Sequence, residues 1–171
     1  MKSFVKIIGS ICFLGLGFGV FWSCESDDLC DKSVNTPRLI VRFYDASATS
    51  TVKSVDNLIV YGEGTNTILT NATTDSLALP LKVTNPTTTY VLVSEATYDA
   101  TSGTITSGNV ATVTFTYSTE EEFVGKACGF KVVYNTLSAT VENLGNSWVK
   151  SVNIKNTSVK DENSAQIQLY H

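Results

Sequence analysis

Cysteine is the side chain of this sequence with the richest covalent chemistry, and the position of Cys24 indicates acylation. Lys2 and Lys6 begin the chain, an apolar segment fills residues 7–22, and Cys24 follows after one serine. A basic start, a short apolar core and a small residue before the cut are typical of a secretory signal peptide. We therefore predict that residues 1–23 are removed as a signal peptide and that Cys24 becomes the new N-terminus.

A helix that spans the membrane is the alternative for this apolar segment. Its roughly 16 residues rise about 1.5 Å each and reach roughly 24 Å, whereas the hydrocarbon core of a bilayer is about 30 Å thick. The tetrapeptide Phe21-Trp22-Ser23-Cys24 instead resembles a bacterial lipobox, whose cysteine carries a diacylglyceryl group, with Phe21 in place of the usual Leu or Val. We expect a lipid anchor on Cys24, against the alternative of an ordinary cleavage site, because two acyl chains suffice for stable anchoring.

A short acidic tether, residues 24–29, follows the predicted cut. Within it, Glu25-Ser26-Asp27-Asp28 resembles the acidic export tag that follows the lipidated cysteine in surface lipoproteins of Bacteroidota. The six steps from Cys24 to Cys30 span at most roughly 20 Å, at about 3.5 Å each. We expect an outer membrane lipoprotein of the cell envelope. The tag favours a surface-exposed domain and the short tether favours a periplasm-facing one, so both orientations stay open.

Cys30 and Cys128 are the cysteines of the folded part, since Cys12 leaves with the signal peptide. Two thiols that reach an oxidising compartment are more often paired than free, so we predict a disulfide between Cys30 and Cys128. In an extended strand, Cys128 shares a face with the apolar residues Phe130 and Val132. This parity predicts a sulfur that faces the core and hence a buried bridge.

Few side chains of this sequence suit catalysis or metal binding. His171 is the only histidine and stands at the end of the chain, where we expect it to be frayed, whereas Ser or Cys nucleophiles usually need a positioned base. Paired carboxylates can hydrolyse glycosides, but carboxylates at strand ends are far more often simply solvated. The carboxylates considered are Glu63, Glu95, Asp99 and Glu142. We predict that the protein is not an enzyme, and we expect no metal and no cofactor.

Two other features of the sequence are weaker indications, one of a binding face and one of a modification site. Arg38, Arg42 and Tyr44 alternate on one face of an expected strand, where they suit an acidic partner or a sugar. The alternative, which we favour, is that the arginines neutralise nearby carboxylates. Asp75-Ser76-Leu77 resembles the short O-glycosylation signal of exported Bacteroidota proteins, which makes Ser76 a candidate for a glycan, although the same serine can simply open a strand.

Composition indicates one β-rich domain that does not bind nucleic acid. The net charge of −4 becomes more negative when the signal peptide takes two lysines away, which argues against nucleic acid as a partner. Thr, Ser, Val and Asn are abundant, and apolar residues alternate in about nine short segments. These features predict an all-β fold, a single antiparallel β-sandwich of 8–9 strands over residues 30–171, with a β-barrel as the alternative.

Four of the expected strands are specific enough to be compared with a structure. Residues 38–45 place Leu, Val and Phe on one face, and residues 76–83 contain a proline that predicts a sheet edge or a bulge. Residues 89–95 are apolar on both faces, which predicts a central strand. An acidic turn at residues 120–122 is expected to precede a strand over residues 123–135.

A series of short motifs runs through the chain in a fixed order. They are Cys30, Thr36-Pro37-Arg38-Leu39, Arg42-Phe43-Tyr44-Asp45, Thr74-Asp75-Ser76-Leu77, Leu79-Pro80-Leu81, Ala127-Cys128-Gly129-Phe130 and Trp148. With these motifs, the chain resembles a family of uncharacterised Bacteroidota lipoproteins, a domain of unknown function. The resemblance covers nearly all of the chain after the signal peptide, and it implies a lipidated, secreted β domain with no assigned activity.

Together these inferences lead to one expected function and one alternative. We expect a lipid-anchored structural or protein-interaction component of the outer membrane, whose partners are the membrane and an envelope protein. The alternative is a surface-exposed module that binds glycan or another extracellular ligand. The two differ in which side of the outer membrane the domain faces.

Overall fold

The computed structural model describes residue 30, residues 35–144 and residues 146–171 of the chain. The predicted signal peptide, the predicted lipidation site Cys24 and the rest of the predicted tether lie outside the described residues. The described chain divides into two compact units. The smaller unit contains Cys30 and residues 124–129, and the larger unit contains residues 35–123 and 130–171.

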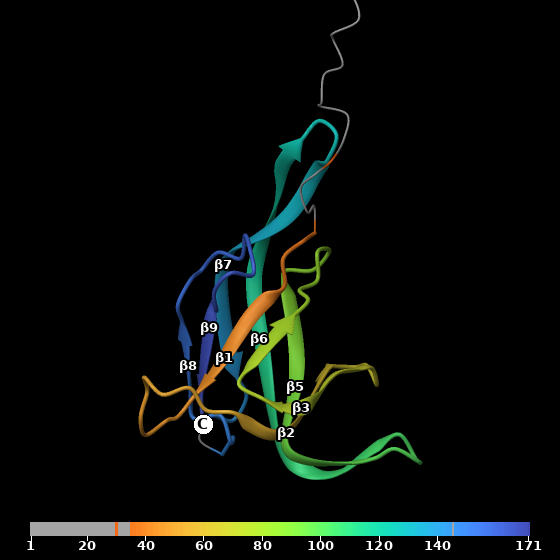
Figure 1. Ribbon diagram of the computed structural model, residues 1–171, viewed down its shortest axis with the longest axis vertical. Helices are drawn as coiled ribbons and strands as arrows, with labels where there is room; N and C mark the ends of the chain where they lie inside the picture. Colours follow the sequence, from red (N-terminus) through yellow and green to blue (C-terminus); the bar gives the residue numbers. More distant parts are fainter. Residues whose placement is uncertain (1–29, 31–34, 145) are drawn as a thin grey trace, which may run out of the picture. The chain divides into compact units, whose positions relative to one another are not determined.

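Nine strands in two sheets make up the described structure (Figure 1). The first sheet has the order β4-β1-β9-β8, with β1 at Leu39–Tyr44, β4 at Ser76–Leu79, β8 at Ser151–Ile154 and β9 at Ile167–Tyr170. The second sheet has the order β3-β2-β5-β6-β7, with β2 at Val55–Gly62, β3 at Ile68–Thr74, β5 at Thr87–Asp99, β6 at Thr104–Gly125 and β7 at Gly129–Val141. The all-β fold and the two-sheet arrangement predicted from the sequence are confirmed.

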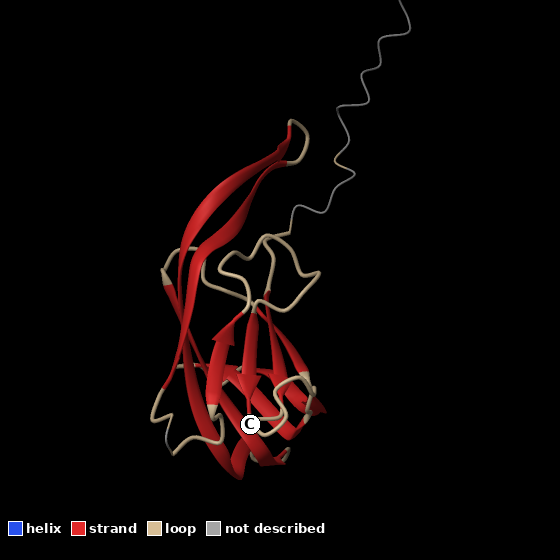
Figure 2. Ribbon diagram, turned by 90° about the vertical axis from the view of Figure 1, so that its left-hand side faces the viewer, coloured by secondary structure: helices blue, strands red, loops and turns tan. Residues whose placement is uncertain are grey.

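The part of the chain that the structure describes consists of strands and loops (Figure 2). No helix within it is long and apolar enough to cross a membrane.

Alternation of apolar and polar residues explains which face of each strand is buried. In β1, Leu39, Val41 and Phe43 are fully buried, as predicted, because successive side chains of a strand point to opposite faces. In β6, Val113 and Phe115 occupy the matching inward positions. The inward faces of both sheets contribute to one hydrophobic core.

Two predictions about strand position are also confirmed. β5 lies in the middle of its sheet, between β2 and β6, which accounts for its apolar residues on both faces. β4 lies at the edge of its sheet as predicted, but it ends at Leu79, directly before Pro80, whereas the strand was predicted to continue to residue 83. A proline has no N–H to donate to a neighbouring strand, so it cannot continue a strand in the interior of a sheet.

One strand pairing differs from the prediction of a purely antiparallel sandwich. β9 pairs with β1 in parallel, with Val41 opposite Ile167 and Tyr44 opposite Tyr170. The local alternation of side chains specifies the buried face of a strand but not the direction of its partner. A long connection separates β1 from β9, and such a connection permits parallel pairing.

The position of the turn between β6 and β7 was also predicted wrongly. Residues 120–122 were expected to form a turn, but β6 continues through them to Gly125, and the chain reverses at residues 126–128. The three glutamates are tolerated in the strand because they are exposed or only half-buried there. The reversal instead coincides with Gly129, whose φ of 72° lies in the region that glycine adopts without steric cost.

Candidate functional site

Three core tyrosines donate hydrogen bonds to three consecutive backbone carbonyls, those of residues 80–82. The hydroxyl of Tyr90 in β5 donates to the first carbonyl, that of Tyr134 in β7 to the second at 2.9 Å, and that of Tyr117 in β6 to the third at 2.8 Å. Residues 80–82 follow the end of β4, outside the named strands, so the tyrosines provide these carbonyls with donors. We refer to the three side chains as the tyrosine clasp.

A buried threonine extends the tyrosine clasp. The Oγ1 atom of Thr88 accepts a hydrogen bond of 3.0 Å from the backbone N–H of Lys82 and lies 2.6 Å from the Tyr117 hydroxyl. The single Tyr117 proton is donated to a carbonyl, so the Thr88 hydroxyl donates to Tyr117. Burial raises the pKa of Tyr90 and Tyr134 to about 12 and also raises the pKa of Tyr117. The clasp hydroxyls therefore remain protonated near neutral pH and keep their donor role.

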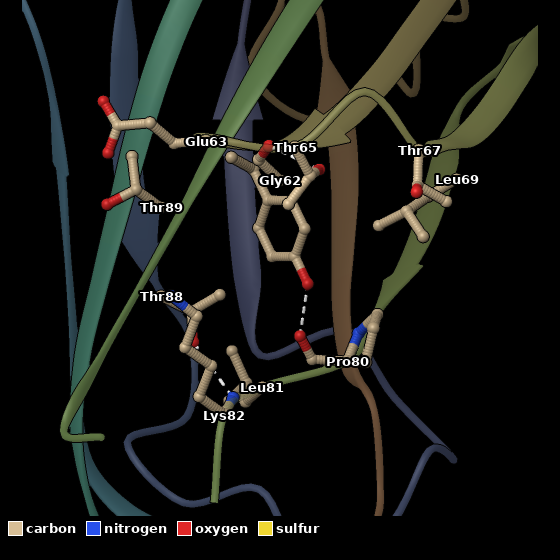
Figure 3. Close-up of a pocket in the computed structure, with 11 residues that line it drawn as sticks. Gly62, Glu63, Thr65, Thr67, Leu69, Pro80, Leu81, Lys82, Thr88 and Thr89 are labelled. Carbon is tan, nitrogen blue, oxygen red and sulfur yellow. Dashed lines mark hydrogen bonds between the residues drawn. The ribbon is translucent and has the colours of Figure 1, made fainter. Parts of the chain in front are cut away.

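A groove of about 330 Å³ lies over this part of the protein (Figure 3). In Figure 3, Glu63 and Thr65 lie at one end of it and Leu81 and Lys82 at the other. We call it the threonine groove, and its lining residues are Gly62, Glu63, Thr65, Thr67, Leu69, Pro80, Leu81, Lys82, Thr88, Thr89 and Tyr90. Pockets for small ligands start at about 300 Å³, so the groove has room for a group of modest size.

The loop between β2 and β3 forms one wall of the threonine groove. Thr65 stabilises this loop, because both its backbone N–H and its hydroxyl donate to the carbonyl of Gly62, at 3.0 and 2.8 Å. The backbone N–H of Glu63 donates to the carbonyl of Thr89 in β5 at 3.0 Å, which holds the loop against the sheet. The lining of the groove therefore combines threonine side chains with the apolar side chains of Leu69, Pro80 and Leu81.

The predicted face of Arg38, Arg42 and Tyr44 is engaged by other residues of the chain. Arg38 forms a bidentate ion pair with Glu162, with an Nη2–Oε2 distance of 2.7 Å, and its backbone N–H also donates to this carboxylate at 3.0 Å. These hydrogen bonds lower the pKa of Glu162. Arg42 forms an ion pair of 3.3 Å with Asp75. The geometry fits neutralisation of carboxylates, while binding of an external acid or sugar stays a prediction.

Two neighbours complete this face of β1. The ring of Tyr44 packs on that of Tyr170 in the parallel strand β9, with centroids 5.7 Å apart. Ser76, the candidate for O-glycosylation, begins β4 and pairs with Arg42 in the antiparallel register. Ser76 is half-buried and its backbone N–H donates to Thr74 Oγ1 at 3.2 Å. Its modification stays a prediction.

His171 is packed, and the expectation that it is frayed is wrong. Its ring lies edge-on to Phe43 and Trp148, with centroids 6.0 and 5.6 Å away. Its backbone N–H donates to the carbonyl of Tyr44, and its own carbonyl accepts from Ala46, both at 3.0 Å. Burial lowers the pKa of His171. The contacts arise because β9 enters the sheet beside β1, which sequence reasoning did not predict.

Two of the four carboxylates considered for catalysis, Asp99 and Glu95, accept hydrogen bonds from neighbouring residues. Asp99 accepts hydrogen bonds from Thr101 N–H at 2.8 Å and Ser102 Oγ at 2.7 Å, which lower its pKa and stabilise the β5–β6 turn. Glu95 accepts a hydrogen bond of 3.0 Å from Asn109. Within the described ranges, His, Cys, Asp and Glu do not gather in groups of three or more that would hold a metal ion.

The predicted disulfide is present, but it is not buried in the core. Cys30 and Cys128 are bonded, with Cα atoms 4.9 Å apart and a sequence separation of 98 residues. Cys30 is exposed and Cys128 is half-buried in the turn between β6 and β7. The parity argument failed because Cys128 lies in this turn, where side chains do not alternate as they do in a strand.

The strands before and after this turn pair with each other, and we define the ribbon as residues 118–123 and 130–135. Within the ribbon, Tyr134 also pairs with Val159. β5 pairs with β6 only as far as Thr116, so beyond that residue β6 has β7 as its neighbour. Phe123 and Phe130 are 59% and 61% exposed, and their rings meet edge-to-face with centroids 5.2 Å apart. Sequence parity placed Phe130 in the core and did not single out this pair.

Comparison with known proteins identifies a family but no activity. Residues 57–171 match the model of a family described as a family of unknown function, DUF6452. No curated protein and no solved structure matches the chain significantly. Several motifs noted in the sequence, Cys30 among them, precede the matched range.

Proposed function

We infer the function of this chain from its own geometry, because the chain belongs to DUF6452, a family whose function is unknown. We propose that it is a lipid-anchored protein of the outer membrane that acts through binding rather than catalysis. In this proposal Cys24 carries the anchor, and residues 30–171 form a β-sandwich domain that serves as a structural or protein-interaction component of the envelope.

The disulfide is the observation on which this proposal mainly rests. Cys30 is bonded to Cys128, so the chain is covalently tied to the β6–β7 turn only six residues after Cys24. Six residues span at most roughly 20 Å. A disulfide at this place would hold the folded chain close to an anchored Cys24. Disulfides also persist mainly in oxidising compartments outside the cytosol, which supports export.

The environment of the acidic side chains supports a non-enzymatic role. Asp99 stabilises a turn, and Glu162 is paired with Arg38. The hydroxyls of the tyrosine clasp donate to backbone carbonyls. These groups act as structural elements, and none of them is held ready next to a base or a nucleophile that the described residues provide.

Metabolic labelling with palmitate tests the anchor. We expect the wild-type protein to take up label and fractionate with membranes, and Cys24→Ala to lose both properties. Cys12→Ala is the matched control, because it removes a cysteine from the same N-terminal segment and should change neither. A Cys24→Ala protein that stays in the membrane would contradict the proposal. Protease treatment of intact cells, compared with cells whose outer membrane is opened, then distinguishes the surface from the periplasm.

The threonine groove supports a second candidate function, the binding of a glycan. Its threonine and apolar side chains suit a sugar ring, and its volume of about 330 Å³ lies at the lower end of the range for pockets that bind small ligands. A panel of oligosaccharides, screened by calorimetry with the wild-type protein, tests this candidate. Thr67→Val in the groove should weaken any binding that is found, while Thr119→Val on the ribbon, also at an exposed threonine, should not.

A further inference from the structure

The exposed pair Phe123 and Phe130 requires an explanation beyond folding. A phenylalanine side chain buries on the order of 150–250 Å² when it is packed, yet each of these rings is more than half exposed. The two rings contact each other at 5.2 Å, so they form one apolar patch. Adjacent exposed aromatic rings of this kind mark interaction sites more often than isolated ones do.

The charged residues beside the pair are partly neutralised by neighbours on the ribbon. Lys131 forms an ion pair of 3.3 Å with Glu122, and Asn135 donates a hydrogen bond of 2.7 Å to Glu120. Two of the three consecutive glutamates therefore have partners on β7. The ion pair with Lys131 neutralises Glu122, which lowers the electrostatic cost of bringing the ribbon to a surface that is neutral or weakly charged.

The disulfide connects Phe123 and Phe130 to the proposed lipid anchor through a short stretch of chain. Phe130 is two residues after Cys128 and Phe123 is five residues before it, and Cys128 is bonded to Cys30. From Cys30, six residues lead back to Cys24, over roughly 20 Å at most. With Cys24 as the proposed anchor, the disulfide thus ties the pair covalently to a residue held at the bilayer.

We propose that Phe123 and Phe130 insert into the interface of the membrane that holds the lipid anchor, so that the ribbon is a second point of attachment. This inference rests on the proposed anchor at Cys24. Aromatic and aliphatic side chains on an otherwise polar element bind in this way at the boundary of headgroups and acyl chains. A single acylated residue leaves a domain free to pivot, and a second contact restricts that motion.

The test uses tryptophan reporters in the mature chain, coupled through Cys24 to a maleimide lipid in phosphatidylcholine vesicles. The coupling does not depend on lipidation in the cell, so the inference is tested even if palmitate labelling fails. Phe130→Trp is the reporter, and Val110→Trp is the matched control, because Val110 is 59% exposed and lies on β6 outside the ribbon. Trp148 is present in both variants and contributes the same background.

We expect brominated lipids to quench the added fluorescence of Phe130→Trp several-fold more than that of Val110→Trp. Equal quenching of the two variants would overturn the inference. A blue shift of the Phe130→Trp emission that appears without vesicles and grows with protein concentration would also overturn it, because the pair would then bind a second copy of the chain. A Phe123→Ser, Phe130→Trp variant should lose most of the lipid quenching, since half of the apolar patch is removed.

Discussion

The hydroxyl of Tyr134 in β7 donates a hydrogen bond of 2.9 Å to the carbonyl of Leu81, which lies 53 residues earlier in the sequence. Tyr134 belongs to the five-stranded sheet, whereas Leu81 follows the edge strand β4 of the four-stranded sheet. The bond is fully buried, and it links the two layers of the sandwich by a polar contact within an apolar core.

Removing this hydroxyl should destabilise the protein. We expect Tyr134→Phe to lower the free energy of unfolding by about 1–3 kcal/mol, because the Leu81 carbonyl would be left buried without its donor. Tyr98→Phe is the control, since Tyr98 is 37% exposed and should tolerate the change. Denaturation in urea measures both variants, and equal stability of Tyr134→Phe and the wild type would show that the bond contributes little.

The tyrosine clasp also predicts loss of stability at alkaline pH. Burial raises the pKa of Tyr90 and Tyr134 to about 12, against about 10 for an unfolded tyrosine. The neutral tyrosines are therefore favoured in the folded state. Their contribution to the free energy of unfolding is fully present below pH 10 and is lost as the pH rises through 12. Unfolding followed across that range should show a steep decrease for the wild type and a shallower one for Tyr134→Phe.

The disulfide should contribute strongly to stability. Cys30 and Cys128 are separated by 98 residues, and loss of a native disulfide in a small exported domain typically costs about 2–5 kcal/mol. We expect the double variant Cys30→Ser, Cys128→Ser to unfold at lower denaturant concentration than the wild type. The reduced wild-type protein should match the double variant, whereas Cys24→Ser should unfold like the oxidised wild type.

Gly108 in β6 should be intolerant of a side chain. Its φ is 142°, and an added Cβ would meet Val93 Cγ1 and lie 3.0 Å from the Ser94 carbonyl oxygen. We expect Gly108→Ala to cost about 1–3 kcal/mol, because both the backbone conformation and the space are unfavourable. Gly125→Ala is the control, since no atom beyond its two chain neighbours lies within 4 Å of its added Cβ. In thermal unfolding, Gly108→Ala should have a clearly lower midpoint temperature than Gly125→Ala.

Much of the fold could be predicted from short-range patterns. The alternation of Leu39, Val41 and Phe43 identified the buried face of β1, and Pro80 identified a sheet edge. Both follow from local stereochemistry, since side chains alternate along any strand and proline never donates to a sheet. The parallel pairing of β1 with β9 could not be predicted this way, because it depends on which distant strand occupies a vacant sheet edge.

The candidate sites depended even more on distant contacts. The threonine groove combines the β2–β3 loop with residues 80–82 and β5, and no single stretch of sequence contains these parts. The ion pair between Arg38 and Glu162 likewise joins residues 124 positions apart. The exposed pair of Phe123 and Phe130 was missed because the hairpin was placed too early, which assigned Phe123 and Phe130 to one strand.

The sequence by itself determined the class of fold, the partner of Cys30 and the inward positions of most strands. Composition and alternation act residue by residue, and the prediction that Cys12 is removed and Cys24 is lipidated left a single pairing for Cys30. Only the tertiary structure decided that the bridge lies at a turn, that three tyrosines converge on residues 80–82 and that His171 packs on Phe43 and Trp148. These features depend on which strands become neighbours, and that choice is made by the packing of the whole core.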